Sequence, residues 1–531
     1  VLLFTRPRRF GKTLNMSMFS YFFDLNKKRE KSIFADLYIG KEKEICAKYQ
    51  NQHPVIYISL KDVKAYDYEI MQGMFKTVIF NLCNQLYYLL SSDKLMENQK
   101  KIFEDLTYRD YSKIELQDTI LFLSQLLYQH HQKKVIILID EYDTPLQEAY
   151  LHTVNKNIPL NSEDSYYAKA VNLLRGIFGS ALKDNPCLEK AILTGIARVA
   201  QESLFSSLNN IKSYSMLNEN YGQYFGFTDD EVKQMLKEVN LENKYDDLKS
   251  WYNGYNIGKY AIYNPWSIIN CLSESGKFGL HWLNTGSTGL LDWIKSSNSD
   301  SLKADLETII SKTSIRRSIS EHIVFKDLKD SDNALWSLLF FTGYVNISNV
   351  ELVSDNFEAD LSIPNYEVKL AYISMIKRWM ITSLNQYNYE KFLDSLVTGE
   401  MGLFKRFLQE YLMKAGSYFD FNQTTPEQVF HLFFLGIIAG LFEKYDIKSN
   451  HEMGLGRSDI IIVPRDHNKQ SIVMEFKIVE EAKKLKKAAK EAVKQIKLKR
   501  YIDGAPTKDK LLIGVAFYGK ETEIYSEVIK E

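Results

Sequence analysis

The sequence Gly-Lys-Thr occurs at residues 11–13, in a short loop that follows an apolar run at the start of the chain. Residues 1–4 (VLLF) lead into residues 5–13 (TRPRRFGKT), and a helical pattern continues from residue 14 to about 23. In a strand–loop–helix of this kind, loop N–H groups and the helix N-terminus attract phosphate. Lys12 would reach the β- and γ-phosphate oxygens of ATP, and the Thr13 hydroxyl would be a ligand of Mg²⁺.

The loop departs from the usual phosphate-binding sequence at its first position, where Arg6 stands in place of a glycine. Arg and Pro cannot adopt the positive φ angles that are open to Gly, so we expect this loop to enter at a different angle. Gly-Lys-Thr after a strand also occurs in structural turns, so this loop alone does not establish a nucleotide-binding site. The residues expected to bind the nucleotide are Arg9, Phe10, Gly11, Lys12 and Thr13.

A buried strand that ends in two acids strengthens the nucleotide hypothesis. Residues 135–139 (VIILI) form a continuous β-branched apolar run, typical of a strand covered on both faces, and Asp140 and Glu141 follow it. Asp140 would hold Mg²⁺ through water, and Glu141 would polarise the attacking water. The alternative is a solvated acidic turn. The order of loop and acidic strand favours nucleotide binding.

A third strand, residues 190–196 (KAILTGI), carries two further candidates. Thr194 lies where a sensor of the γ-phosphate would belong, although a hydroxyl at a strand end can also cap backbone. Arg198 could sense phosphate or act as an arginine finger, or it could be an ordinary surface arginine. Helical stretches at about 69–91, 113–131 and 165–183 alternate with the strands, which predicts a parallel α/β sheet.

A second group of reactive residues lies near the C-terminus. Asp459 opens the strand DIIIV, and Glu475 and Lys477 share one face of the strand SIVMEFKI. Pairing of these strands can bring Asp459 beside the other two. Two carboxylates suit Mg²⁺ or Mn²⁺, which would activate a water while Lys477 orients it or neutralises a phosphate. This is the chemistry of metal-dependent phosphodiester cleavage; a solvent-facing alternation is the alternative.

The helix that follows, at about 480–502, has a strongly basic composition. From residue 483 to residue 500 it carries one acid, Glu491, against the bases Lys483, Lys484, Lys486, Lys487, Lys490, Lys494, Lys497, Lys499 and Arg500. A solvated helix usually mixes both signs, so this run favours a nucleic-acid partner over a merely solvated face. Gln495 and Tyr501 could contact the phosphate or the metal-bound water. Glu427 and His431 share a helix face, and His431 is either an extra metal ligand or a core histidine.

Composition excludes several classes of protein. The 531 residues are 45% hydrophobic and 13% aromatic with zero net charge, which excludes a largely disordered chain and suggests about three domains. Four distant cysteines match no zinc, redox or disulfide pattern, so we expect buried free thiols in a reducing compartment. No apolar run is long enough to cross a membrane and no signal peptide is visible, which predicts a cytoplasmic protein. Because Val1 already begins a strand, we expect a truncated N-terminus.

The middle of the chain offers few chemical features. Thr228 followed by Glu231 predicts a capping box at a helix start. Residues 251–267 are rich in aromatic and turn residues and predict an ordered, packed loop region. Residues 300–415 read as helical.

These residues resemble a bacterial family that joins an AAA-ATPase-like domain to a C-terminal PD-(D/E)xK nuclease domain. The similar segments are TRPRRFGKTLN, ILIDEYDTPL, LTGIARV with FSSLNN, WYNGY with YNPWS, and GRSDIII with MEFK. The resemblance implies that the missing glycine is a family trait. It assigns phosphate binding to Lys12 and Thr13, the Walker B role to Asp140 and Glu141, and the nuclease role to Asp459, Glu475 and Lys477. Gln495 and Tyr501 are similar to a Gln…Tyr pair of exonuclease-like members, at a longer spacing.

The sequence therefore predicts an α/β protein with three parts: a P-loop ATPase at 1–222, a helical middle region at 223–415, and a restriction-endonuclease-like α/β domain at 416–531. The preferred hypothesis is an ATP-driven switch or motor that controls a metal-dependent nuclease, with DNA favoured over RNA as partner. The protein could also form a homo-oligomer, because ATPases of this kind often complete their nucleotide sites across subunits. The rival hypothesis is a nucleotide-dependent signalling protein whose C-terminal domain binds nucleic acid or a partner without cutting.

Overall fold

The computed structural model shows two compact units. One comprises Val1–Ser287 and Arg316–Asn365, and the other Thr288–Ile315 and Tyr366–Glu531. This division is coarser than the three expected domains, whose boundaries stay predictions. The structure describes residues 1–196, 204, 210–282, 305, 309, 314–321, 327–328, 331–353, 356–372, 374, 386–415, 430, 434, 437–441, 444–453, 456–466, 468–501 and 507–530.

The first unit is built on a five-stranded parallel sheet with the order β2-β3-β4-β1-β5, as the alternation of strands and helices predicts. The carboxyl ends of parallel strands meet at one edge, so the ends of β1, β3 and β4 lie side by side there. The strands are β1 (Leu2–Thr5), β2 (Val55–Ser59), β3 (Val135–Asp140), β4 (Leu188–Gly195) and β5 (Lys212–Tyr214).

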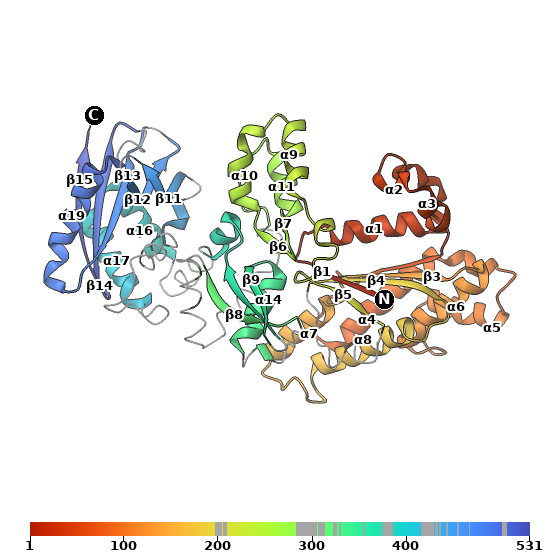
Figure 1. Ribbon diagram of the computed structural model, residues 1–531. Coiled ribbons are helices and arrows are strands. Elements are labelled where there is room, and N and C mark those ends of the chain that lie inside the picture. The colour runs from red at the N-terminus through yellow and green to blue at the C-terminus, as the bar shows by residue number, and fades with distance from the viewer. Residues whose placement is uncertain are drawn as a thin grey trace. The chain divides into compact units, whose positions relative to one another are not determined.

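Helices cover both faces of this sheet (Figure 1). Helix α1 packs on one face, where Met16 joins Phe4, Leu138 and Ile192 in a buried apolar cluster. Helices α4, α6 and α8 lie on the other face. The helices of this part are α1 (Lys12–Phe23), α2 (Tyr38–Lys41), α3 (Lys43–Tyr49), α4 (Tyr68–Gln85), α5 (Glu97–Thr107), α6 (Thr119–His131), α7 (Thr144–Asn155) and α8 (Tyr166–Leu182).

A small helical subdomain follows the sheet. It contains α9 (Asp229–Glu238), α10 (Tyr245–Tyr252) and α11 (Pro265–Ser273), with the hairpin β6 (Tyr255–Ile257) and β7 (Tyr260–Ile262). We call residues 228–282 the α9–α11 subdomain. The predicted capping box is confirmed, because Thr228 and Glu231 bond each other's backbone N–H at the start of α9. Asp229 accepts hydrogen bonds from Tyr245 and Tyr263, which fastens α9 to α10 and to the hairpin.

The prediction of helix throughout 300–415 is wrong at 315–319, 346–353 and 356–362. There the strands β8 (Ile315–Ile319), β9 (Asn346–Val353) and β10 (Asn356–Ser362) form a sheet of order β8-β10-β9. Almost all of β9 is exposed, so its sequence lacks the apolar alternation of a half-buried strand, and only pairing with β10 defines it. Helix α14 (Asp332–Thr342) precedes this hairpin, and α16 (Gln386–Thr398) and α17 (Met401–Ala415) follow within the expected helical range.

The second unit contains a five-stranded mixed sheet of order β11-β12-β13-β14-β15. Only the β13–β14 pair is parallel. Strand β15 has no counterpart in the sequence analysis, because its mostly half-exposed residues give no clear alternation. The elements are β11 (Tyr445–Met453), β12 (Gly456–Pro464), β13 (Ser471–Ile478), α19 (Leu485–Leu498), β14 (Lys510–Tyr518) and β15 (Glu521–Ile529).

Helix α19 crosses the sheet at a glycine. The helix buries an apolar stripe that includes Leu485, Ala489 and Val493. Directly below it, a Cβ added to Gly514 of β14 would lie 2.1 Å from the Ala489 carbonyl oxygen. A side chain at position 514 would therefore lift the helix from the sheet. On the opposite face, Phe476 and Phe517 pack against Phe434 and Phe430.

Three of the four cysteines, Cys83, Cys187 and Cys271, are buried, Cys46 is partly buried, and all four are free. Burial raises the pKa of the Cys83 thiol to about 12, so it is inert at neutral pH. The expectation of buried free thiols is thus confirmed for these three. Among the described residues, no helix combines the length and apolarity required to cross a bilayer; the cytoplasmic location stays a prediction.

We predict that Gly514→Ala destabilises the C-terminal sheet by about 2 kcal/mol or more, because backbone of α19 must move. Gly402→Ala is the matched control, since nothing lies within 4 Å of its added Cβ in α17, and there a helical alanine should be neutral or stabilising. Differential scanning calorimetry of the full chain measures both. An unchanged transition in Gly514→Ala would contradict the close packing described above.

Candidate functional site

Three hydroxyl and carboxylate groups meet at the carboxyl edge of the parallel sheet. Asp140 is fully buried at the end of β3, and its two oxygens accept hydrogen bonds from Thr13 and Thr194, each at 2.6 Å. Thr13 is the second residue of α1. Thr194 lies beside Asp140 because Leu193, the residue before it in β4, pairs with Ile139, the residue before Asp140 in β3. The structure thus brings together three of the residues singled out from the sequence.

Lys12 lies inside the loop that precedes it. Its amino group donates to the carbonyls of Arg6 at 3.0 Å and Pro7 at 2.9 Å, and the side chain is buried. Burial lowers the pKa of Lys12, while the charges of Glu141, Asp143 and Asp140 oppose this shift. A cation held this close to the loop and to three acids can transfer to phosphate oxygens without leaving the site.

The loop backbone has the shape of an anion-binding turn. Arg9 and Gly11 adopt left-handed conformations with φ of 67° and 77°, and Gly11 precedes the first residue of α1. Alternation of this kind points successive N–H groups into one concavity. The side chains of Arg9 and Phe10 do not enter it, because Arg9 stacks on Trp266 and Phe10 is buried against Tyr255. These two residues can therefore contact a phosphate through their backbone.

The structure explains why arginine is tolerated at position 6. The Arg6 side chain is fully buried and turns into the protein, where it donates to the carbonyls of Thr5, Tyr214 and Tyr221. Its guanidinium also lies 5.2 Å from the ring of Phe225. Burial lowers the pKa of Arg6 to about 9, so the group remains cationic at neutral pH. Arg6 thus anchors the loop from within and leaves the φ > 0 positions to Arg9 and Gly11.

Glu141 follows Asp140 in a left-handed conformation with φ of 52°, and it accepts from the Thr144 hydroxyl at 3.4 Å. Asp143 is a buried residue that the sequence analysis did not single out. Its carboxylate accepts from the Ile196 N–H and the Gln147 amide, both at 2.9 Å, and so ties the end of β4 to the start of α7. Its place in the run DEYD is the only sequence signal. Arg198 lies outside the described residues.

The C-terminal sheet brings its predicted residues together as well. The Asp459 carboxylate accepts from the N–H of Phe476 at 2.7 Å, which places it beside Glu475. The Lys477 amine lies 3.7 Å from the Glu475 carboxylate. The Glu475 side chain is 4% exposed and that of Lys477 is 32% exposed, so the lysine reaches toward solvent while the acid is held in the protein.

Helix α19 supplies another group to this site. The Gln495 amide donates to the same oxygen of Glu475 that Lys477 faces. Tyr501 is buried nearby; burial raises the pKa of its phenol, a hydrogen bond with Gln495 opposes the shift, and the charges of Glu475 and Asp459 add to it. The pair inferred from the resemblance therefore lies at the carboxylates. Glu427 and His431 lie outside the described residues.

Two family models match the chain. Residues 1–205 match the model described as predicted AAA-ATPase, and residues 425–527 match the PD-(D/E)XK nuclease superfamily. The chain joins a predicted AAA-ATPase domain to a PD-(D/E)XK nuclease superfamily domain. Along nearly its whole length it is similar to an uncharacterized protein in the vnfD 5′ region of Azotobacter chroococcum mcd 1. The two are 23% identical over 544 residues, which cover 99% of this chain and 91% of that protein.

Both domains offer oxygen donors suited to a hard divalent cation. In the ATPase domain these are the Thr13 hydroxyl and the Asp140 carboxylate, already within 2.6 Å of each other. In the nuclease superfamily domain they are the carboxylates of Asp459 and Glu475. The described residues contain no group of three or more His, Cys, Asp or Glu side chains placed to hold a metal.

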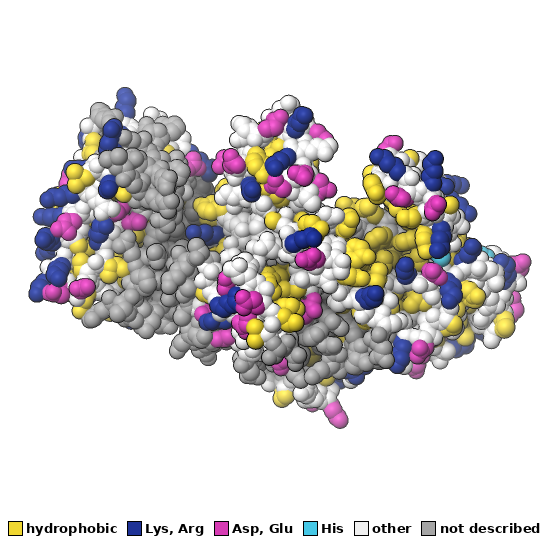
Figure 2. Space-filling model, in the orientation of Figure 1, with side chains coloured by type: hydrophobic (Ala, Val, Ile, Leu, Met, Phe, Trp, Pro, Cys, Tyr) yellow, Lys and Arg dark blue, Asp and Glu magenta, His cyan; other side chains and the backbone are white. Residues whose placement is uncertain are grey.

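The lysines of α19 lie along one side of the nuclease superfamily domain (Figure 2). Several lysines in and next to this helix have acidic partners: Lys484, just before α19, pairs with Glu481 at 3.0 Å, Lys487 pairs with Glu491 at 3.8 Å, and Lys497 pairs with Glu527. Within the described part of the chain, Lys486, Lys494 and Lys499 form no ion pair. The basic face is thus partly neutralised, and its contact with nucleic acid stays a prediction.

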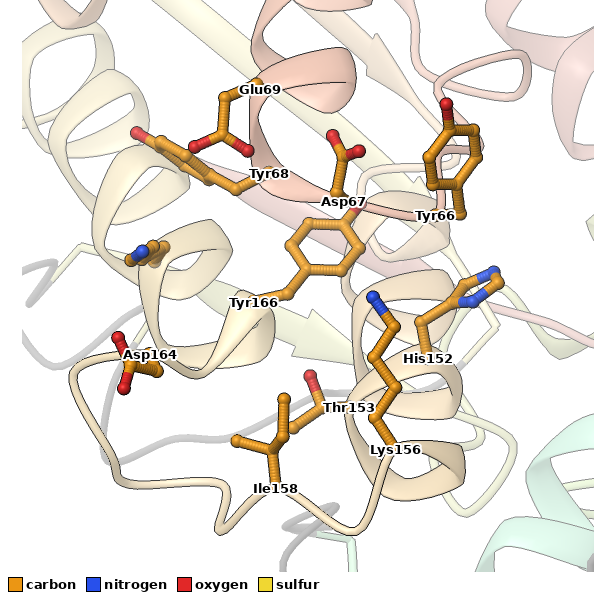
Figure 3. Close-up of a pocket in the computed structure, with 11 residues that line it drawn as sticks. Tyr66, Asp67, Tyr68, Glu69, His152, Thr153, Lys156, Ile158, Asp164 and Tyr166 are labelled. Atoms are coloured by element: carbon orange, nitrogen blue, oxygen red, sulfur yellow. The ribbon is translucent and has the colours of Figure 1, made fainter.

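The ATPase domain also contains a cavity of about 110 Å³ between the ends of α4, α7 and α8 (Figure 3). None of the predicted site residues line it. Its lining combines acids with bases and therefore indicates no particular ligand. The charged lining residues are Asp67, Glu69, Asp164, His152, Lys156 and Lys169.

We predict that Arg6→Met lowers the free energy of unfolding by about 3 kcal/mol, because it leaves buried carbonyls without their donor. The control is Arg109→Met, which removes an exposed guanidinium that stacks 4.6 Å from the ring of Phe80 and should cost less than about 1 kcal/mol. Urea unfolding followed by circular dichroism compares the two. Equal effects would show that Arg6 does not anchor the loop.

Proposed function

We propose that this protein binds and hydrolyses ATP in its AAA-ATPase domain and thereby controls metal-dependent cleavage of a nucleic-acid backbone, preferably DNA, by its PD-(D/E)XK domain. The observation that carries the proposal is the convergence of Asp459, Glu475, Lys477 and Gln495 in a chain that also assembles Thr13, Asp140 and Thr194 around a phosphate loop. A homo-oligomer is part of the proposal, because ATPases of this kind often complete their sites across subunits.

In the ATPase domain, each residue has a role that follows from its present contacts. Lys12 exchanges the carbonyls of Arg6 and Pro7 for phosphate oxygens. Thr13 and Asp140 hold Mg²⁺, which when bound would offset the charge on the phosphoryl oxygens. Glu141 orients the attacking water, and Thr194 fixes the orientation of the Asp140 carboxylate. The buried position of Asp140 keeps these interactions away from bulk water, where they would be weaker.

In the nuclease superfamily domain, Asp459 and Glu475 hold Mg²⁺ or Mn²⁺, which would lower the pKa of a water that attacks the phosphodiester. The Phe476 N–H and the Gln495 amide fix the orientation of the two carboxylates. Lys477, whose side chain is more exposed than that of Glu475, reaches the scissile phosphate or the attacking water. The lysines of α19 add long-range attraction for the polyanion.

We predict that Lys12→Ala raises the Kd for ATP by about 100-fold, since it removes a charge-assisted contact worth about 2–3 kcal/mol. The matched control is Lys27→Ala: this lysine contacts Ser20 and the ring of Tyr21 further along α1. Isothermal titration calorimetry with Mg²⁺ and a slowly hydrolysed ATP analogue measures both affinities. Wild-type affinity in Lys12→Ala would exclude the phosphate loop as the nucleotide site.

We predict that Lys477→Ala reduces Mg²⁺- or Mn²⁺-dependent DNA cleavage by about 100-fold or more while ATP binding is retained. Chelation of the metal should abolish cleavage in the wild type. Lys486→Ala, which changes a lysine of α19 without an ion pair in the described residues, serves as control and should retain cleavage. Wild-type protein that binds DNA or RNA but does not cut it under any metal and nucleotide condition would support the rival, non-cleaving function.

A further inference from the structure

The α9–α11 subdomain contacts the phosphate loop at three successive residues. The Arg9 guanidinium lies 4.3 Å from the centre of the Trp266 ring. The Arg8 carbonyl accepts from the Trp282 indole at 3.2 Å and from the Asn264 amide at 3.5 Å. The Phe10 ring packs edge-on against Tyr255 at 5.0 Å. We call Asn264, Trp266 and Trp282 the loop clamp.

The loop clamp connects the phosphate loop directly to the start of helix α11, because two of its three residues belong to that part of the chain. Asn264 is the N-cap of α11, where its side-chain oxygen accepts from the Ser267 N–H at 3.2 Å while its amide reaches Arg8. Trp266 lies in the first turn of the same helix and donates to the His281 carbonyl at 3.1 Å. A shift of the loop at Arg8 or Arg9 therefore acts directly on the start of α11 and on residues 281–282.

The loop has a reason to shift when phosphate arrives. Lys12 donates to the carbonyls of Arg6 and Pro7, the two residues immediately before Arg8. Phosphate oxygens would compete with these carbonyls for the three N–H donors of Lys12, and a carbonyl that loses its donor must find a new partner or change orientation. The affected peptide groups adjoin the one that the loop clamp holds. Phosphate binding at the loop and the contacts of the loop clamp therefore affect adjoining peptide groups and should change together.

We propose that the α9–α11 subdomain senses nucleotide occupancy through the loop clamp. The clamp stabilises the left-handed conformation of Arg9, so nucleotide binding orders the start of α11, and by reciprocity loss of the clamp weakens nucleotide binding. Asn264, Trp266 and Trp282 are positioning residues in this account, since they act through the loop. The inference rests on the proposed ATP binding at Lys12. It adds that the α9–α11 subdomain responds to the state of that site.

The test uses the full chain with Mg²⁺ and ATPγS. Hydrogen–deuterium exchange should slow in residues 264–282 of the wild type when ATPγS binds. Trp266→Leu should abolish this protection and raise the Kd measured by calorimetry about fivefold, since it removes a cation–π contact. Trp251→Leu is the matched control, because Trp251 belongs to the same subdomain but stacks on Phe278; it should leave the affinity and the protection of 264–282 intact.

A second variant keeps the inference testable if Trp266→Leu does not fold. Asn264→Ser retains a capping oxygen for α11 but loses the donor to Arg8, and we expect a Kd raised about threefold with reduced protection. Binding of ATPγS without any change of exchange in 264–282 would overturn the inference and leave the proposed ATP site intact. Wild-type affinity and protection in both variants would overturn it equally, and absence of ATPγS binding to the wild type would overturn both proposals.

Discussion

The fully buried carboxylate of Asp140 is the group around which the N-terminal unit is organised. A buried charge destabilises a protein unless it is hydrogen-bonded, and here the two partners are hydroxyls from two other elements. Their bonds require β3 and β4 to pair so that Thr194 lies beside Asp140, and they require α1 to begin where Thr13 can reach the same carboxylate. The order β2-β3-β4-β1-β5 satisfies both requirements at one edge of the sheet.

A phosphate loop without its first glycine needs support from elsewhere in the chain. The inward Arg6 supplies one part, because its three carbonyl partners lie on Thr5 and on the segment that contains Tyr214 and Tyr221. The left-handed conformation of Arg9 is costly for a residue with a Cβ. Its stacking on Trp266 offsets part of that cost. The loop is therefore shaped by tertiary contacts where a glycine-rich loop would rely on backbone freedom.

The C-terminal unit also holds acidic side chains inside the protein, but on a mixed sheet. Asp459 and Glu475 are neighbouring carboxylates that would repel each other in a dry environment. The Phe476 N–H and the Gln495 amide each supply a donor, and the Lys477 amine lies close to Glu475. Gln495 reaches Glu475 because α19 lies low on the sheet, which the bare Cα of Gly514 permits. A packing detail on β14 thus controls the geometry of polar groups on β13.

The sequence by itself determined the parallel α/β sheet, the two domain types and the residue types at both sites, because buried strands and short motifs carry local signals in hydrophobicity and spacing. Glu475 and Lys477 share a face in any strand, and Lys12 and Thr13 must follow the loop. Only the tertiary structure decided the direction of the Arg6 side chain, the buried link from Asp143 to Ile196, and the pairing of β9 and β15. The contacts of Arg6 with Tyr214 and Tyr221 and of Asp143 with Ile196 join residues far apart in the chain, which no local pattern reveals. Strands β9 and β15 pair with the neighbouring strands β10 and β14, but their mostly exposed or half-exposed residues give no apolar alternation by which a strand could be recognised.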